Sequence, residues 1–141
     1  TVEELRHAYR VPREIMELAL PLLDTIAPTT RPPISYRTGA AAPTVVHVDE
    51  QHLVAEAFHA AAAAPDGLLA VILPEGMTAP SDELVPVLSP REAKGLEFDH
   101  VVVVEPALID LRELYVALTR PTKSLPVVHA RPLPAELAYD R

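Results

Sequence analysis

Cysteine and tryptophan are absent from this chain of 141 residues, and glycine occurs only four times, at positions 39, 67, 76 and 95. Without cysteine the chain has no disulfide, no thiolate metal ligand and no thiol nucleophile, which fits a reducing compartment such as the cytoplasm. The sequence also contains no G-x-x-x-x-G-K-[ST] pattern. It therefore lacks the loop that cradles phosphates and supplies a magnesium-binding hydroxyl.

Long apolar segments are missing as well. No run of 18 apolar residues occurs, so the sequence predicts no membrane-spanning helix. The first ten residues, TVEELRHAYR, are charged and have no apolar signal core. They do not begin with Met, and we expect one domain, residues 1–141, from a larger cytoplasmic protein without membrane contact.

Positive charge is scarce. Lys and Arg number 12 and Asp and Glu number 20, giving a formal net charge of −8. This balance argues against a free-standing basic nucleic-acid module and favours a protein partner over free DNA. The six histidines are scattered; His52 and His59 lie seven apart on one helical face, where a structural or solvated role is favoured over zinc. We therefore expect no metal site.

Hydrophobic spacing in the first half of the chain predicts helix, connector, strand and helix. Apolar side chains at helical spacing predict a first helix, which Pro21 should kink or end; they are Ile15, Leu18, Ala19 and Leu22. Residues 27–43 contain four prolines and are typical of an extended connector. The β-branched run 44–48 predicts a strand, and Asp49 is suited to cap a helix over about 51–64.

The second half alternates in the same way. Strands are predicted at 68–73, 85–89, 101–105 and 125–130. A helix is predicted before the last of these strands. Asp110 and Glu113 have the spacing of a capping box at its start, and Pro121 should end it. The alternation predicts an α/β fold with a mainly parallel sheet of about five strands flanked by helices.

Ligands of such sheets bind beyond the carboxyl ends of the strands, so the loop 90–98, which leaves the strand 85–89, is the first candidate for a site. Within it Lys94 could meet a phosphate, Gly95 permits close approach of the backbone, and Glu97 could accept a hydrogen bond from a ribose hydroxyl. On composition alone, a solvated turn with Gly95 at positive φ is the favoured interpretation.

Two arginines are further candidates. Arg120, in the last turn of the predicted helix, either complements the helix dipole or reaches a phosphate at a domain edge. We expect Asp110 and Pro121 to fix this helix, so that Arg120 is held at a defined place on the domain surface. The pair Tyr9-Arg10 precedes the first helix. Taken alone, Tyr9 is more often a half-buried aromatic and Arg10 a surface cation than a ligand-binding pair.

Taken together, three segments resemble motifs IV, V and VI of superfamily 1 helicases of the UvrD/Rep type, in the family's order: Tyr9–Ile15 (YRVPREI), Lys94–Asp99 (KGLEFD) and Leu114–Arg120 (LYVALTR). The last two strings are specific in combination. The resemblance covers nearly the whole chain and implies the second RecA-like domain of such a motor. It is greatest to HelD-like proteins, in which no large inserted domain separates motifs IV and V, and which use ATP to help release bacterial RNA polymerase from nucleic acid.

The resemblance also implies roles. Tyr9 would stack on adenine and Arg10 would contact the γ-phosphate, while Gly95 and Glu97 would lie near the triphosphate and the ribose. Arg120 would be the arginine finger, a group typically worth about 10³–10⁵ in rate. ATP and Mg²⁺ would bind the parent protein, whose N-terminal RecA-like domain, DNA and RNA polymerase would be the partners. The chain alone should bind neither ATP nor Mg²⁺ tightly and should not hydrolyse ATP.

The chain departs from the family pattern at three places. Val11 stands where the family often has Ser or Thr, so a helix cap is missing. Pro121 replaces a small residue after the motif VI arginine and should change how Arg120 is presented. Ser89-Pro90-Arg91 occupies the stretch where DNA helicases often carry Thr and His against the single strand. Ser89 and Arg91 are therefore candidate nucleic-acid contacts with altered chemistry.

Two functions from different classes stay open. One is half of an ATP-driven motor, which completes a nucleotide site built mostly elsewhere. The other is a non-catalytic interaction domain that keeps the RecA-like fold to bind a protein such as RNA polymerase. The set Arg10, Glu97 and Arg120 favours the motor, because a domain kept only for binding needs no phosphate-reaching arginines. An independent nucleotide-binding enzyme is disfavoured by the absent phosphate loop.

Overall fold

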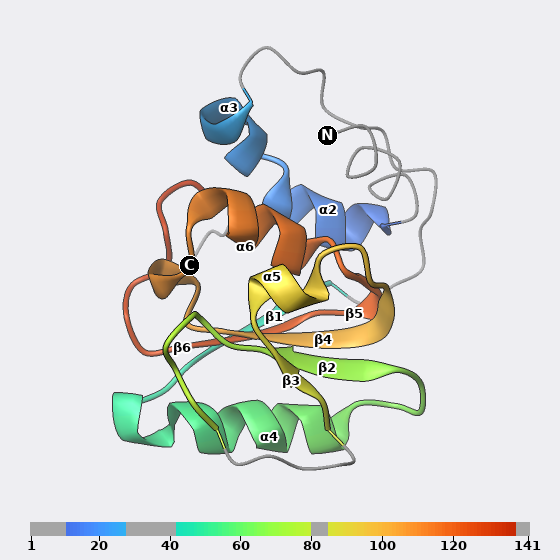
Figure 1. The fold of residues 1–141 in the computed structure, drawn as a ribbon, viewed down its shortest axis with the longest axis vertical. Coiled ribbons are helices and arrows are strands. Elements are labelled where there is room, and N and C mark those ends of the chain that lie inside the picture. The colour runs from blue at the N-terminus through green and yellow to red at the C-terminus, as the bar shows by residue number, and fades with distance from the viewer. Residues whose placement is uncertain (1–10, 28–41, 80–84, 138–141) are drawn as a thin grey trace.

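A six-stranded, wholly parallel sheet forms the centre of the computed structural model, which describes residues 11–27, 42–79 and 85–137 (Figure 1). Its main path runs β1-β6-β4-β2-β3, and β5 pairs with the first part of β4. The strands are β1 (Thr44–His47), β2 (Leu69–Ile72), β3 (Val87–Leu88), β4 (Phe98–Val104), β5 (Pro121–Ser124) and β6 (Pro126–His129). The α/β class predicted from the sequence is thus confirmed.

Helices cover both faces of this sheet (Figure 1). One face carries α2 (Arg13–Ala19), α3 (Leu22–Ile26), α5 (Pro90–Ala93) and α6 (Leu111–Leu118), and the other carries α4 (Leu53–Ala63). Two short 3₁₀ helices, η1 (Glu50–His52) and η2 (Pro106–Leu108), follow the ends of β1 and β4. Among the residues described, no helix is long and apolar enough to cross a membrane.

The middle strand, β4, supplies core residues to both faces. Val101 and Val103 pack in the cluster that includes α2 and α6, whereas Val102 and Val104 pack in the cluster under α4. Each of these four side chains is fully buried, and burial of one valine contributes about 1.5–3 kcal/mol. A continuous valine run is therefore the expected sequence of a parallel strand covered on both sides.

Several local predictions are confirmed. The first helical pattern breaks at Leu20-Pro21, giving α2 and α3 in place of one helix. Asp110 caps α6, since its carboxylate accepts hydrogen bonds from the backbone N–H groups of Arg112 and Glu113 at 3.1 and 3.4 Å. The connector expected over 27–43 lies almost wholly outside the described residues.

Other predictions are wrong in detail. The helix after Asp49 begins as the 3₁₀ turn η1, and the Asp49 side chain makes no capping hydrogen bond. The segment 90–98 is not simply a loop, because it begins with the short helix α5. Glu113 forms an ion pair with Arg91 at 3.0 Å rather than completing a capping box with Asp110.

The sixth strand, β5, was not expected at all. Its sequence, PTKS, has neither an apolar run nor a clear alternation. It is a strand because it lies beside the start of β4, where Phe98 is opposite Pro121 and His100 is opposite Ser124. Tertiary pairing, not intrinsic propensity, determines this element.

Glu105 closes the end of β4 in an unusual way. It is 1 % exposed and has a left-handed backbone at φ 50°. Its Oε1 atom accepts hydrogen bonds from the backbone N–H groups of Ala130 and Arg131 at 3.1 and 3.0 Å. One carboxylate oxygen thereby satisfies two donors at the point where β6 ends, and joins the ends of β4 and β6.

We predict that Glu105→Ala lowers the free energy of unfolding by about 1–3 kcal/mol, because two partly buried N–H groups lose their side-chain acceptor. Glu105→Gln keeps an oxygen in the same place and should cost markedly less. Urea unfolding of the wild type and both variants checks this. Equal free energies for Glu105→Ala and the wild type would show that the carboxylate does not hold the two strand ends.

Candidate functional site

The described residues expected from the resemblance to bind nucleotide come together at one edge of the sheet. The segment Gly95–Glu97 enters β4 at its amino end, and Arg120 comes directly before β5. Since Phe98 pairs with Pro121, the residues just before them, Glu97 and Arg120, are brought to the same edge. Tyr9 and Arg10 lie outside the described residues.

These residues lie at the amino edge of the sheet, whereas the rule for parallel sheets predicted a site at the carboxyl edge. Strands β3 and β4 both run parallel to β2, so residues 89–97 must cross the sheet from its carboxyl edge to its amino edge. Ser89 follows β3 at the carboxyl edge, as expected for a loop leaving a strand. Gly95 and Glu97 lie at the opposite edge, because α5 has carried the chain back to the start of the next strand.

Arg120 is buried, not on the surface as expected, with only 2 % of its area exposed. Its Nε atom donates to the carbonyl of Val116 at 2.9 Å, and Nη1 donates to the carbonyl of Leu96 at 3.4 Å. Its own carbonyl accepts from the N–H of Phe98 at 3.2 Å. The guanidinium thus joins the last turn of α6 to the segment that carries Gly95 and Glu97.

The last turn of α6 has both backbone and side-chain donors. The N–H of Thr119 donates to the carbonyl of Val116 at 3.2 Å, and the N–H of Arg120 donates to the carbonyl of Ala117 at 3.3 Å. The Arg120 side chain adds a further hydrogen bond to Val116. The arginine is therefore folded back onto its own helix, and Pro121 begins β5 directly after it.

Gly95 turns the chain between α5 and β4. Its φ is +82°, a conformation that side chains with a Cβ rarely adopt, and a Cβ built there would meet no atom within 4 Å. The glycine is thus required by backbone conformation and not by lack of space. The turn leaves Leu96 46 % exposed, with its carbonyl against Arg120.

Asp99 is a structural residue of this edge that the sequence reasoning did not single out. Its Oδ2 accepts a hydrogen bond from the backbone N–H of Leu68 at 2.8 Å, and Oδ1 lies 3.6 Å from Nζ of Lys123. The Leu68 hydrogen bond, with the smaller effect of Lys123, holds the pKa of Asp99 below its usual value. Gly67 allows this approach, because a Cβ there would lie 2.6 Å from Oδ2.

The two candidate nucleic-acid contacts are occupied within the domain. The Ser89 hydroxyl accepts from the N–H of Glu92 at 3.2 Å, and the Ser89 N–H donates to the Glu92 carboxylate at 2.9 Å, forming a capping box for α5. The Arg91 guanidinium donates to Glu113 of α6, which raises the pKa of Arg91. The Arg91 side chain is nevertheless 80 % exposed.

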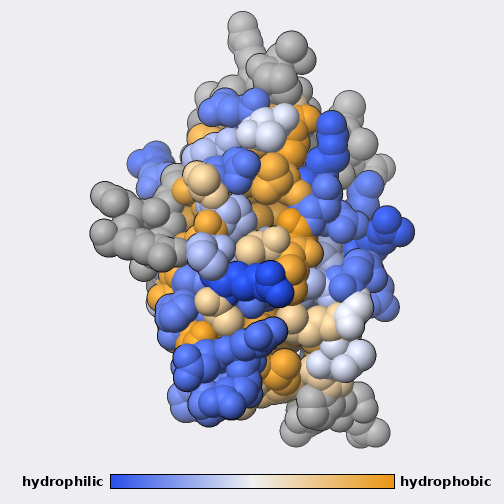
Figure 2. Space-filling view, turned by 90° about the vertical axis from the view of Figure 1, so that its left-hand side faces the viewer, coloured by the Kyte–Doolittle hydropathy of each residue, from blue (hydrophilic) through white to orange (hydrophobic). Residues whose placement is uncertain are grey.

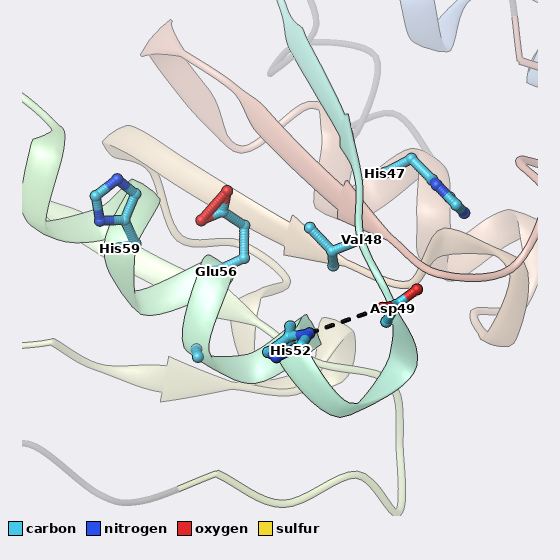
Figure 3. Close-up of a pocket in the computed structure, with 7 residues that line it drawn as sticks. His47, Val48, Asp49, His52, Glu56 and His59 are labelled. Atoms are coloured by element: carbon cyan, nitrogen blue, oxygen red, sulfur yellow. Dashed lines mark ion pairs between the residues drawn. The ribbon is translucent and has the colours of Figure 1, made fainter.

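A separate cleft lies between the end of β1 and α4 (Figure 3). Its lining residues are His47, Val48, Asp49, His52, Ala55, Glu56 and His59. His52 lies 4.0 Å from Asp49, but His47 is turned toward β6, where its ring is 5.1 Å from that of His129. Within the described ranges no group of three or more His, Cys, Asp or Glu could hold a metal ion.

The surface at the left of Figure 1, where β1 leads into η1, is partly apolar. Figure 2 shows an apolar band running along it between polar flanks. Leu108 of η2, which follows β4 at this carboxyl edge, is 47 % exposed. This face is distinct from the amino edge, where Gly95, Glu97 and Arg120 lie.

Comparison with solved structures shows the same fold in a crystal structure of the C-terminal domain of a possible DNA helicase from Lactobacillus plantarum WCFS1. The TM-score is 0.64 and the identity 20 %, and the match covers 92 % of each chain. No protein-family model matches the sequence, and no curated protein matches it. The shared feature is thus the fold over nearly the full length of both chains.

The Asp99 contacts predict a pH dependence of stability. Because its folded pKa is lowered, Asp99 stabilises the fold above the unfolded pKa of about 3.9, and this contribution is lost as the pH falls through the folded pKa. The difference in unfolding free energy between the wild type and Asp99→Asn should therefore be largest near neutral pH and shrink in acid. Urea unfolding across the acid range measures it, with the exposed Asp66→Asn as control. A difference that does not change with pH would contradict the assignment.

Proposed function

We propose that this chain is the C-terminal RecA-like half of an ATP-dependent superfamily 1 helicase or translocase. The observation that carries the proposal is the direct contact between Arg120 and Leu96. It joins two segments, 24 residues apart, that resemble motifs VI and V of these motors. The fold shared with the C-terminal domain of a possible DNA helicase supports the same reading.

The chemistry of the edge suits a nucleotide held by a second domain. A guanidinium offers a planar set of donors for the oxygens of a γ-phosphate, and the exposed Glu97 carboxylate can accept from a ribose hydroxyl. In this proposal the preceding RecA-like domain holds the phosphates and Mg²⁺, whose charge would help neutralise the transferring phosphoryl group. The described part of this chain has no ligand cluster for the metal itself.

The proposed macromolecular partner is RNA polymerase, as in HelD-like proteins. A formal charge of −8 suits a protein surface better than a polyanion. Ser89 uses its hydroxyl to cap α5, so Arg91 is the better of the two candidates for contact with nucleic acid. DNA would then be bound mainly through other parts of the motor.

Arg120→Ala should lower ATP turnover by the full-length protein by about 10²–10⁵-fold, because the transition-state charge loses its guanidinium. Nucleotide affinity should change much less, since the other domain holds most of the phosphate contacts. Arg120→Lys keeps the charge but not the planar donors and should also be impaired. Steady-state hydrolysis and a nucleotide-binding titration measure the two effects.

Arg112→Ala is the matched control, because Arg112 is an exposed arginine in the first turn of the same helix. It should leave turnover unchanged. Wild-type turnover in Arg120→Ala would contradict the proposal and favour a non-catalytic interaction domain instead.

The Gly95 turn gives a second test. Gly95→Ala and Gly76→Ala both place a Cβ at positive φ, +82° and +85°, with no atom within 4 Å in either case. Each should cost about 1 kcal/mol of stability from the backbone conformation alone. Only Gly95→Ala should also lower ATP turnover, because it moves the Leu96 carbonyl that contacts Arg120. Equal ATP turnover in the two variants would show that the Gly95 turn does not contribute to the nucleotide site.

A further inference from the structure

The residue before Arg120 is in direct contact with its guanidinium. Thr119 is 1 % exposed and follows the last residue of α6. Its Oγ1 lies 2.8 Å from the carbonyl oxygen of Tyr115 and 3.1 Å from that of Val116. On its other side, Nη2 of Arg120 donates to the same oxygen at 3.3 Å.

The chemistry of a hydroxyl gives this contact a direction. A threonine hydroxyl has one proton, which here is donated to a carbonyl of the last helical turn. The lone pairs of Oγ1 are then left to accept from Arg120. The Thr119 hydroxyl thereby links the last helical turn to the guanidinium. It donates to a carbonyl of that turn and accepts from Arg120.

Arg120 is held from three directions as a result. Nε is bound by the Val116 carbonyl, Nη1 by the Leu96 carbonyl and Nη2 by the Thr119 hydroxyl. Two of these acceptors are backbone atoms, which a side-chain substitution cannot remove. The Thr119 hydroxyl belongs to a side chain, so a substitution can delete it.

We propose that Thr119 is a positioning residue for Arg120: its hydroxyl orients the guanidinium plane for the phosphate of a nucleotide bound by the neighbouring domain. This inference rests on the proposed function. An arginine that acts on a transferring phosphoryl group must be held in a defined orientation, because a misplacement of about 1 Å can cost 10²-fold in rate.

A purely structural role is the alternative, since threonine at a helix end commonly bonds to the preceding turn. The two roles differ in their consequences. A structural role affects stability and leaves turnover by the folded protein unchanged. A positioning role affects the chemical step while nucleotide binding and stability change little.

The experiment compares Thr119→Val, Thr119→Ser and Thr122→Val in the full-length protein. Valine keeps the shape of threonine and removes the hydroxyl, while serine keeps the hydroxyl. Thr122 is the matched control, because it is 8 % exposed and its hydroxyl donates to the carbonyl of Phe98 at 3.4 Å instead of contacting Arg120. ATP turnover, the KM for ATP and the melting temperature are measured for each, together with Arg120→Ala.

We expect Thr119→Val to lower kcat by about 10–100-fold with little change in KM, and Thr119→Ser to restore most of it. Thr122→Val should keep the wild-type kcat. If Thr119→Val does not fold, Thr119→Ala is compared with Thr119→Ser in the same way. Wild-type kcat in a folded variant without the hydroxyl overturns the positioning role. If Arg120→Ala also has wild-type kcat, the proposed function fails as well; if Arg120→Ala is impaired, only the present inference fails.

Discussion

The chain must pass from α6 to β5 within two residues, Thr119 and Arg120, and much of the candidate site depends on this junction. A helix that ends so abruptly leaves its last carbonyls to be satisfied outside the regular pattern. The backbone N–H groups of Thr119 and Arg120 donate to the carbonyls of the last turn, and their side chains donate to the same turn as well. The same contacts bury the guanidinium and fix its position beside the amino end of β4.

The parallel sheet then separates two edges with different properties. At the amino edge, α5 returns the chain so that the Leu96 carbonyl, between Gly95 and Glu97, meets Arg120, and Asp99 fastens this segment to Leu68. At the carboxyl edge, Glu105 joins the ends of β4 and β6, and an apolar band is exposed (Figure 2). Under the proposed function, the amino edge is the surface that faces the nucleotide-holding partner domain.

The sequence predicted more of the fold than of the site. Valine runs and helical spacing located the core strands and α6 because burial on both faces leaves a strong pattern. The strand β5 could not be predicted, because PTKS becomes a strand only through its pairing with β4. Gly95, Glu97 and Arg120 were grouped through their resemblance to helicase motifs, and the structure does bring their segments together. The burial of Arg120 could not be predicted, because its guanidinium contacts the Leu96 carbonyl 24 residues away, and no local pattern encodes that contact. The hydrogen bond that Arg120 donates to Thr119 depends on the orientation of two neighbouring side chains, which the sequence does not specify.

The central claim is that a guanidinium at position 120 acts on a bound nucleotide. Its most direct test is chemical rescue: ATP turnover by the full-length Arg120→Ala protein, measured with added guanidinium chloride and with sodium chloride at equal ionic strength. Because the Arg120 side chain is buried, its removal leaves a space that free guanidinium can enter. The account predicts slow turnover that guanidinium partly restores and sodium does not. Turnover already at the wild-type level before guanidinium is added would contradict it.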